Sequence, residues 1–164
     1  MLSGINAGEN LADDITYSGT ISAAMEAALA GIPAVALSQA FRDSGQGFAA
    51  ARGWAARVLA PIIGTPMAKR TLVNVNFPAL AADEVAGIRV VRQGFHDYAR
   101  GSLVEGRDPR GRPYYWFGLD DVEHTLDHGT DLEAVGDGYV AVTPLHVDLT
   151  HHASIGPLAE RYTA

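Results

Sequence analysis

The fold is decided by residues 17–38, which have the sequence YSGTISAAMEAALAGIPAVALS. Apolar residues in the first part recur at the i, i+3, i+4 spacing of an amphipathic helix. Ser18 or Thr20 can cap its start, and the following Gly-Ile-Pro ends it. The uninterrupted apolar run at 33–38 then predicts a strand covered on both faces.

The same alternation of helix and strand continues along the chain. Residues 48–62 carry a second helical pattern, and 71–78 and 87–94 are rich in β-branched residues. This order predicts an α/β fold with a mainly parallel sheet. With 164 residues, the chain is expected to form one domain, residues 1–164, whose α/β core lies in about 1–94.

The second part of the chain, residues 95–164, has a different character. Two β-prone runs flank the turn sequence DPRG at 108–111, which predicts a protruding β-hairpin. Residues 130–133 fit a capping box that starts a short helix, and the sequence YVAVTPL at 139–145 predicts a strand. The last eleven residues are expected either to form a terminal helix or to fray.

Composition excludes several classes of function. The formal net charge is -7 and no Lys or Arg cluster occurs, so a nucleic-acid polymer or an anionic membrane is not an expected partner. One phosphate group could still bind through backbone N–H groups. The chain has no Cys, no signal-peptide pattern and no apolar run long enough for a membrane span, so a cytoplasmic protein is predicted.

Two neighbouring segments could carry chemistry. The loop SGINAGEN at 3–10 presents Asn6 and Asn10 among glycines, and amide oxygens suit hard cations such as Mg²⁺ or Mn²⁺. The alternative is a turn whose amides bond their own backbone. Ser18, Gly19 and Thr20 bring hydroxyls and N–H groups to a helix start, which could hold a phosphate or could be an ordinary N-cap.

Other acidic and histidine residues give weaker patterns. Adjacent residues on a strand point to opposite faces, so the pairs Asp13–Asp14 and Asp120–Asp121 are expected to be exposed loop residues and not metal sites. His124 and His128 could share a helical face for zinc, with surface histidines as the alternative. His151 and His152 are adjacent and would diverge.

Five collinear segments resemble the SurE family of survival-protein nucleotidases. They are SGINAGEN, DDITYSGTISAAMEAALAGIPAVALS, NVNFP, DPRGRPYYWFG and GTDLEAVGDGYVAVTPLHVDLT. The resemblance implies a Rossmann-like SurE fold with a hairpin arm and a C-terminal element. It also implies a metal-dependent 5'/3'-nucleotidase acting on nucleoside monophosphates, using Mg²⁺ or Mn²⁺, and assembled as a swapped homodimer or homotetramer.

The resemblance also assigns residues. Asn6 matches a metal ligand, and Asn10, Ser18, Gly19 and Thr20 match residues that line the phosphate site. The family's Asn-Asp-Asp metal motif and first strands precede SGIN and are not found in this sequence, so we expect the domain to be incomplete at its N-terminus, without its catalytic aspartates, and impaired as an enzyme. The alternative is a non-catalytic α/β module that binds phosphorylated metabolites or serves as an oligomerisation partner.

Overall fold

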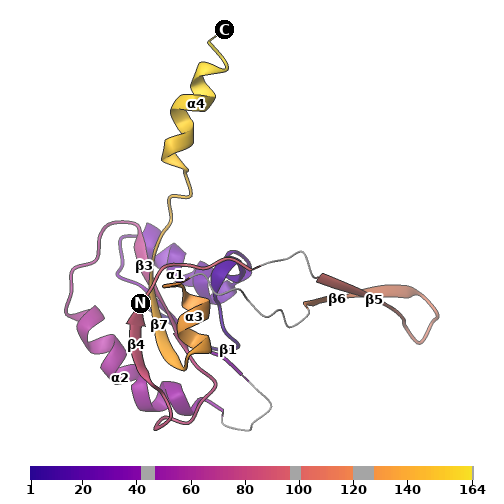
Figure 1. The fold of residues 1–164 in the computed structure, drawn as a ribbon, viewed down its shortest axis with the longest axis horizontal. Helices are drawn as coiled ribbons and strands as arrows, with labels where there is room; N and C mark the ends of the chain where they lie inside the picture. The colour runs from indigo at the N-terminus through magenta and orange to yellow at the C-terminus, as the bar shows by residue number, and fades with distance from the viewer. Residues whose placement is uncertain (42–46, 97–100, 120–127, 164) are drawn as a thin grey trace.

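A mixed β-sheet forms the centre of the computed structural model, which describes residues 1–41, 47–96, 101–119 and 128–163 (Figure 1). The strand order is β1-β2-β3-β7-β4. The strands are β1 (Leu2–Ala7), β2 (Val35–Gln39), β3 (Thr71–Phe77), β4 (Gly87–Val90) and β7 (Tyr139–His146). Three of the four pairings in this sheet are parallel, and β3 with β7 is antiparallel, so the expected mainly parallel sheet is confirmed.

Helix α1 (Gly19–Leu29) covers one face of the sheet. Its buried side chains, including Ile21 and Ala24, pack with Leu72 of β3 and Leu145 of β7. Of the two predicted candidates, Ser18 and Thr20, the N-cap is Ser18, whose Oγ accepts a hydrogen bond from the N–H of Ile21 at 3.2 Å. The helix begins where the sequence predicts because this hydroxyl satisfies one of its unpaired N–H groups.

Helix α2 (Ala49–Ile63) covers the opposite face. Its buried residue Val58 belongs to a core cluster with Leu37 of β2, Val75 and Phe77 of β3, and Val140 of β7. Alternate residues of each central strand therefore face α1 or α2, which explains why every residue of β2 is buried. The predicted strand with two covered faces is confirmed.

Strand β7 shows how the second part of the chain joins the core. It lies between β3 and β4, so a strand from beyond residue 94 completes the sheet. The short helix α3 (Asp131–Gly136) precedes it and packs on it, with Thr130 as the N-cap that the capping-box pattern predicts. The 3-10 helix η1 (Ala12–Tyr17) links β1 to α1.

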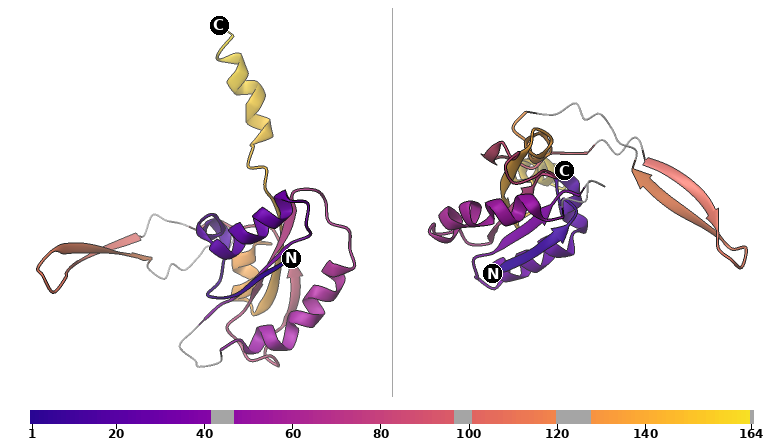
Figure 2. Two further views of the ribbon diagram at one scale, coloured as in Figure 1. Left: turned by 180° about the vertical axis from the view of Figure 1, so that it is seen from behind. Right: turned by 90° about the horizontal axis from the view of Figure 1, so that it is seen from below.

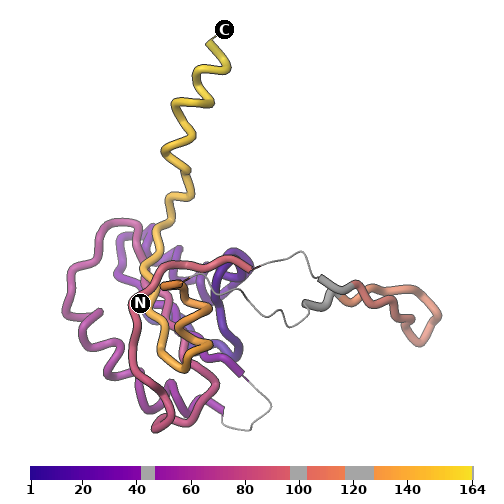
Figure 3. The backbone as a smooth tube through the Cα atoms, in the orientation of Figure 1, coloured from indigo at the N-terminus to yellow at the C-terminus, as the bar shows by residue number. Residues whose placement is uncertain are grey.

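Two elements extend away from the sheet. Strands β5 (Gly101–Arg107) and β6 (Pro113–Leu119) pair as the predicted antiparallel hairpin, which projects from the body in both views of Figure 2. In a different direction from the hairpin, the 3-10 helix η3 (His152–Ser154) and helix α4 (Ile155–Glu160) lead away from the body, as the tube in Figure 3 shows. Among the described residues, no helix is long and apolar enough to cross a bilayer.

Candidate functional site

The candidate site lies at the carboxyl ends of β1, β2 and β3. The loop that follows β1 crosses this edge of the sheet, enters η1 and reaches the N-terminus of α1. In open α/β sheets, ligands bind beyond the carboxyl ends of the strands, where helix N-termini meet. The fold therefore brings the two segments singled out in the sequence, 3–10 and 17–20, to one edge.

Asn6 lies near the end of β1 and is half-buried. Its Nδ2 donates a hydrogen bond to the carbonyl oxygen of Gly8 at 3.0 Å, as the turn interpretation expects. Its Oδ1 has no hydrogen-bond partner among the described residues. The side chain is thus fixed by its nitrogen while its oxygen stays available, and the role of Asn6 as a metal ligand stays a prediction.

Asn10 is buried and anchors the loop to the sheet. Its N–H donates to Oδ1 of Asn76 at 2.8 Å, and its Nδ2 donates to Oγ of Ser38 at 2.6 Å. Its carbonyl oxygen accepts from Nδ2 of Asn74 at 2.8 Å and from Nδ2 of Asn76 at 3.1 Å. A direct contact of the Asn10 side chain with phosphate stays a prediction, and such a contact could use the second hydrogen of Nδ2 while the first stays bonded to Ser38.

The start of α1 has the form of an anion site. The Ser18 hydroxyl is engaged by Ile21, while the N–H groups of Gly19 and Thr20 have no acceptor among the described residues. Nothing lies within 4 Å of the position that a Cβ on Gly19 would occupy, so a ligand can approach the backbone there. Unpaired N–H groups and the positive end of the helix dipole favour an anion.

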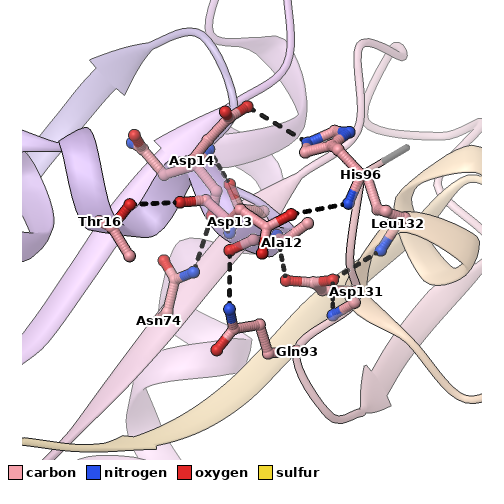
Figure 4. Close-up of polar contacts among 12 residues, drawn as sticks. Ala12, Asp13, Asp14, Thr16, Asn74, Gln93, His96, Asp131 and Leu132 are labelled. Carbon is pink, nitrogen blue, oxygen red and sulfur yellow. Dashed lines mark hydrogen bonds and ion pairs between the residues drawn. The ribbon is translucent and has the colours of Figure 1, made fainter. Parts of the chain in front are cut away.

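Asp13 and Asp14 are half-buried in η1, and the expectation that they are exposed is wrong. Both turn toward His96, which follows β4 in the chain (Figure 4). Asp13 Oδ2 accepts from the backbone N–H of His96 at 2.8 Å, and Asp14 Oδ2 lies 3.3 Å from its Nε2. The two carboxylates therefore hold η1 against the segment after β4.

Asp131 was singled out in the sequence only as part of a capping box, yet it is fully buried beside this loop. Its Oδ1 accepts from the N–H groups of Gly94 at 2.8 Å and Leu132 at 2.9 Å, and its Oδ2 accepts from Ala12 at 3.0 Å (Figure 4). These partners lie far apart in the sequence. An acidic residue in the first turn of a helix is common, so no local signal marks this one as buried.

The described members of the remaining predicted pairs do not lie at the candidate site. His128 is exposed and bonds Glu133 at 2.8 Å, and this hydrogen bond holds the pKa of Glu133 below its ordinary value. His151 bonds Ser154 and His152 bonds Asp148, both near α4. Asp120, Asp121 and His124 lie outside the described residues. Within the described part of the chain, no three His, Cys, Asp or Glu side chains are grouped to hold a metal ion.

A cavity of about 530 Å³ lies at the other end of β1 and β2. Its lining is mostly apolar and includes Met1, Leu2 and Pro33 with Ile62 and Pro66 from the end of α2 and beyond. It presents no charged side chain that could orient a polar ligand. The carboxyl edge of the sheet, with its N–H groups and amides, is therefore the better candidate for polar chemistry.

Comparison with known proteins gives a consistent result. A family model for the survival protein SurE matches residues 1–100. The chain is 60% identical over 164 residues to the 5'-nucleotidase SurE of Erythrobacter litoralis and 52% identical over 166 residues to that of Rhizorhabdus wittichii. Each alignment covers 99% of this chain and 65% of the relative, so the chain spans about two-thirds of the relatives' length.

The fold agrees with a solved structure as well. The crystal structure of the SurE protein from Aquifex aeolicus matches with a TM-score of 0.83 and 38% identity, over 98% of this chain and 64% of that chain. The Rossmann-like α/β fold expected from the sequence is thereby confirmed. With a family model that matches more than half of its residues, and with the same sheet and helices, the chain belongs to the SurE family.

Proposed function

We propose that this chain binds the phosphate group of nucleoside monophosphates at the N-terminus of α1 and takes part in 5'/3'-nucleotidase hydrolysis. One observation carries the proposal: within the described part of the chain, the capped helix start leaves the N–H groups of Gly19 and Thr20 without acceptors at the carboxyl edge of the sheet. The names of the relatives, 5'-nucleotidase SurE, support the same substrate class.

Among the described residues, backbone dipoles are the main source of attraction that we propose for the phosphate. The formal net charge of the chain is -7, and no hydrogen bond or ion pair joins an Arg or Lys side chain to Ser18, Gly19 or Thr20 within the described part of the chain. A helix N-terminus contributes about 0.3–1 kcal/mol when exposed and up to about 2 kcal/mol in partly buried geometry. The described residues therefore favour weak binding of the phosphate group when no other ligand is present.

The residues that the structure describes do not make a complete divalent metal site. Mg²⁺ and Mn²⁺ prefer several hard oxygen ligands, usually with carboxylates among them. The described residues offer the neutral Oδ1 of Asn6, and Asp13 and Asp14 are turned toward His96. A metal-dependent reaction would need further oxygen ligands besides Asn6, whose assignment as a ligand is part of this proposal.

A second candidate function is a non-catalytic module that binds phosphorylated metabolites or serves as an oligomerisation partner. The incomplete metal site favours it, because an anion-binding helix start needs no metal ion to hold phosphate. The two candidates share the phosphate site at Ser18 to Thr20. They differ in whether bound nucleotide is hydrolysed.

Assembly as a homodimer or homotetramer is the remaining part of the proposal. The hairpin displays Leu103, Tyr115 and Trp116 with exposed fractions of 65%, 58% and 67%. Large exposed apolar side chains on a projecting element are typical of an interaction surface. Analytical ultracentrifugation of the chain and of Trp116→Ser tests this, because a monomeric parent chain would contradict it.

The test of function measures phosphate release and nucleotide binding in parallel. Release from AMP and GMP is followed with Mg²⁺, with Mn²⁺ and with a chelator, and binding of AMP is measured by calorimetry. Asn6→Ala should abolish any metal-dependent release, and Ser18→Ala should weaken binding. Ser22→Ala is the matched control, because this hydroxyl lies one turn further along α1 and donates to the Ser18 carbonyl oxygen at 2.8 Å.

The outcomes separate the two candidates. Metal-dependent release that is lost in Asn6→Ala supports the nucleotidase and excludes the non-catalytic module. Binding without release in every metal condition supports the module. If the chain neither binds AMP nor releases phosphate from it, the proposed phosphate site is wrong.

A further inference from the structure

Asp131 is a buried carboxylate whose contacts exceed what a helix cap requires. Its own helix is capped by Thr130, whose Oγ1 accepts from the N–H of Glu133 at 3.3 Å. Asp131 is 0% exposed. Of the three hydrogen bonds that its carboxylate accepts, only the one from the N–H of Leu132 comes from α3. The other two join segments far away in the sequence.

Those two bonds connect the start of η1 to the segment after β4. Asp131 Oδ2 accepts from the N–H of Ala12, 119 residues away, at 3.0 Å. Asp131 Oδ1 accepts from the N–H of Gly94 at 2.8 Å. A carboxylate makes stronger hydrogen bonds to N–H groups than a neutral acceptor does, so one side chain joins η1, α3 and the segment after β4.

Ala12 itself is held on both sides in an unusual conformation. Its φ is 48°, in the left-handed region that costs a non-glycine residue about 1–2 kcal/mol. Its N–H is fixed by Asp131, and its carbonyl oxygen accepts from Nε2 of Gln93 at 3.1 Å. The fully buried Ala12 is therefore held from both sides by distant segments, and these contacts fix the direction in which η1 starts.

Close packing around the carboxylate supports a fixed geometry. A Cβ placed on Gly94 would lie 3.1 Å from Asp131 Oδ1 and 3.1 Å from Cδ1 of Leu132. Such distances are tighter than ordinary van der Waals contact, so glycine allows the backbone N–H to reach the carboxylate. The position of Asp131 is thus set from both α3 and the segment after β4.

The direction of η1 determines where α1 starts. η1 runs from Ala12 to Tyr17, and the N–H of Ser18 still donates to the carbonyl oxygen of Ile15 at 3.4 Å. Ser18 then caps α1. A change at Ala12 is passed to the helix start through two short turns with no intervening linker.

We propose that Asp131 is a positioning residue for the phosphate site: through Ala12 it fixes η1 and so orients Ser18, Gly19 and Thr20 toward the ligand. This role rests on the proposed phosphate site. It requires no contact between Asp131 and the ligand. In this proposal, Asp131 of the sequence GTD at 129–131 organises the phosphate site and also lies in the first turn of α3.

The test compares Asp131→Asn with two controls. Asparagine keeps the shape of the side chain, but its NH2 group must face at least one of the three N–H donors. Glu133→Gln alters an acidic residue of the same helix that bonds Gly129 and His128 and does not touch η1. Val58→Ala removes core volume under α2, on the opposite face of the sheet, and serves as a general destabilised control.

Two readouts are collected on each folded variant. Calorimetry with AMP and with inorganic phosphate gives affinity, and amide hydrogen exchange at Asp14, Ser18 and Ile21 gives local order without any ligand. We expect Asp131→Asn to weaken binding about tenfold, because the free loop can move away from the unpaired buried donor and binding must then restore the ordered loop. Exchange should rise at those three amides and not at α2, whereas Glu133→Gln and Val58→Ala should leave affinity for AMP unchanged.

The outcomes keep this inference separate from the proposed function. Wild-type affinity in Asp131→Asn, or an equal loss of affinity in Val58→Ala, would overturn the positioning role. If the wild-type chain binds neither AMP nor phosphate, the proposed function fails and the positioning role for phosphate fails with it, and exchange then decides only whether Asp131 orders η1 and the start of α1. If Asp131→Asn does not fold, Gln93→Leu replaces it, since this change removes only the bond to the Ala12 carbonyl oxygen and should show the same selective rise in exchange.

Discussion

Asn74 and Asn76 offer a matched test of the buried polar residues that hold the loop from Asn10 to Ser18. Both lie on β3, both are 0% exposed, and being two residues apart they face the same side of the sheet. Each Nδ2 donates to the carbonyl oxygen of Asn10, at 2.8 and 3.1 Å. Only Asn76 also accepts the N–H of Asn10, at 2.8 Å, whereas Oδ1 of Asn74 has no partner among the described residues.

The difference between the two alanine variants can be worked out from these bonds. Asn76→Ala leaves the buried N–H of Asn10 without an acceptor, and an unpaired buried donor costs about 1–3 kcal/mol. Asn74→Ala leaves no donor or acceptor of Asn10 unpaired, because Asn76 still serves the carbonyl oxygen. Both variants lose the same side-chain volume, so Asn76→Ala should be less stable than Asn74→Ala by about 1–3 kcal/mol.

Equilibrium urea unfolding followed by circular dichroism measures this difference as a shift in the transition midpoint. Only a comparison at equal denaturant slopes is used, because a changed slope indicates a changed unfolded state. Because the two variants are compared with each other, the free energy of unfolding of the parent chain is not needed. Equal stabilities, or a less stable Asn74→Ala, would refute the hydrogen-bond assignment of the Asn10 loop.

Three further predictions test other parts of the structure. Ser18→Ala should lower the free energy of unfolding by about 1 kcal/mol through loss of the N-cap, measured in a thermal melt against Ser22→Ala. Gly4→Ala should destabilise the chain more than Gly8→Ala in the same melt: both have positive φ, but a Cβ on Gly4 would overlap the Leu37 carbonyl oxygen. Thr150→Ala should raise the pKa of Asp148 above its value of about 2, seen in a carboxyl NMR titration, because the Thr150 side chain and N–H are the main groups that lower it.

The lowered pKa of Asp148 also fixes the sign of a pH effect on the segment around η3. The pKa of this carboxyl group is lower in the folded chain than the ordinary aspartate value of 3.8, so its contribution to stability is present above that pH. The contribution is lost as the pH falls from 3.8 through about 2. Asp148→Asn should remove this dependence, and helical signal from η3 and α4 that still changes over the same window would contradict the assignment.

Local signals were enough to predict most elements. Four features form where expected: the Ser18 cap, the apolar stripe of α1, the buried run of β2 and the DPRG turn. Each of them is encoded by a few neighbouring residues. Such features depend on neighbours in the chain, through capping, periodicity and turn chemistry. The place of β7 between β3 and β4 was not predicted, because strand order depends on contacts between distant segments.

The long-range hydrogen bonds that hold the candidate site in place could not be predicted from local sequence signals either. Asn10 was singled out as a possible phosphate contact, and its bonds to Ser38, Asn74 and Asn76 join residues up to 66 positions apart. The sequence does hold one indication: two asparagines at alternate positions of an otherwise apolar strand are costly to bury unless they are hydrogen-bonded. The sequence NVNF therefore indicates that these asparagines bond to a buried polar group, but it does not indicate which group.

The long range of these bonds has a consequence for how the proposed phosphate site would work. The loop from Asn10 to Ser18 is held by β3 through Asn76, by the segment after β4 through Gln93, and by α3 through Asp131, at separations of 66, 81 and 119 residues. A loop fixed by the folded sheet has already lost the conformational freedom that binding would otherwise remove. Under the proposed function, the N–H groups of Gly19 and Thr20, which have no acceptor among the described residues, would bind an anion with little further ordering, and affinity for phosphate should fall whenever one of these three connections is broken, even where no residue that touches the ligand is changed.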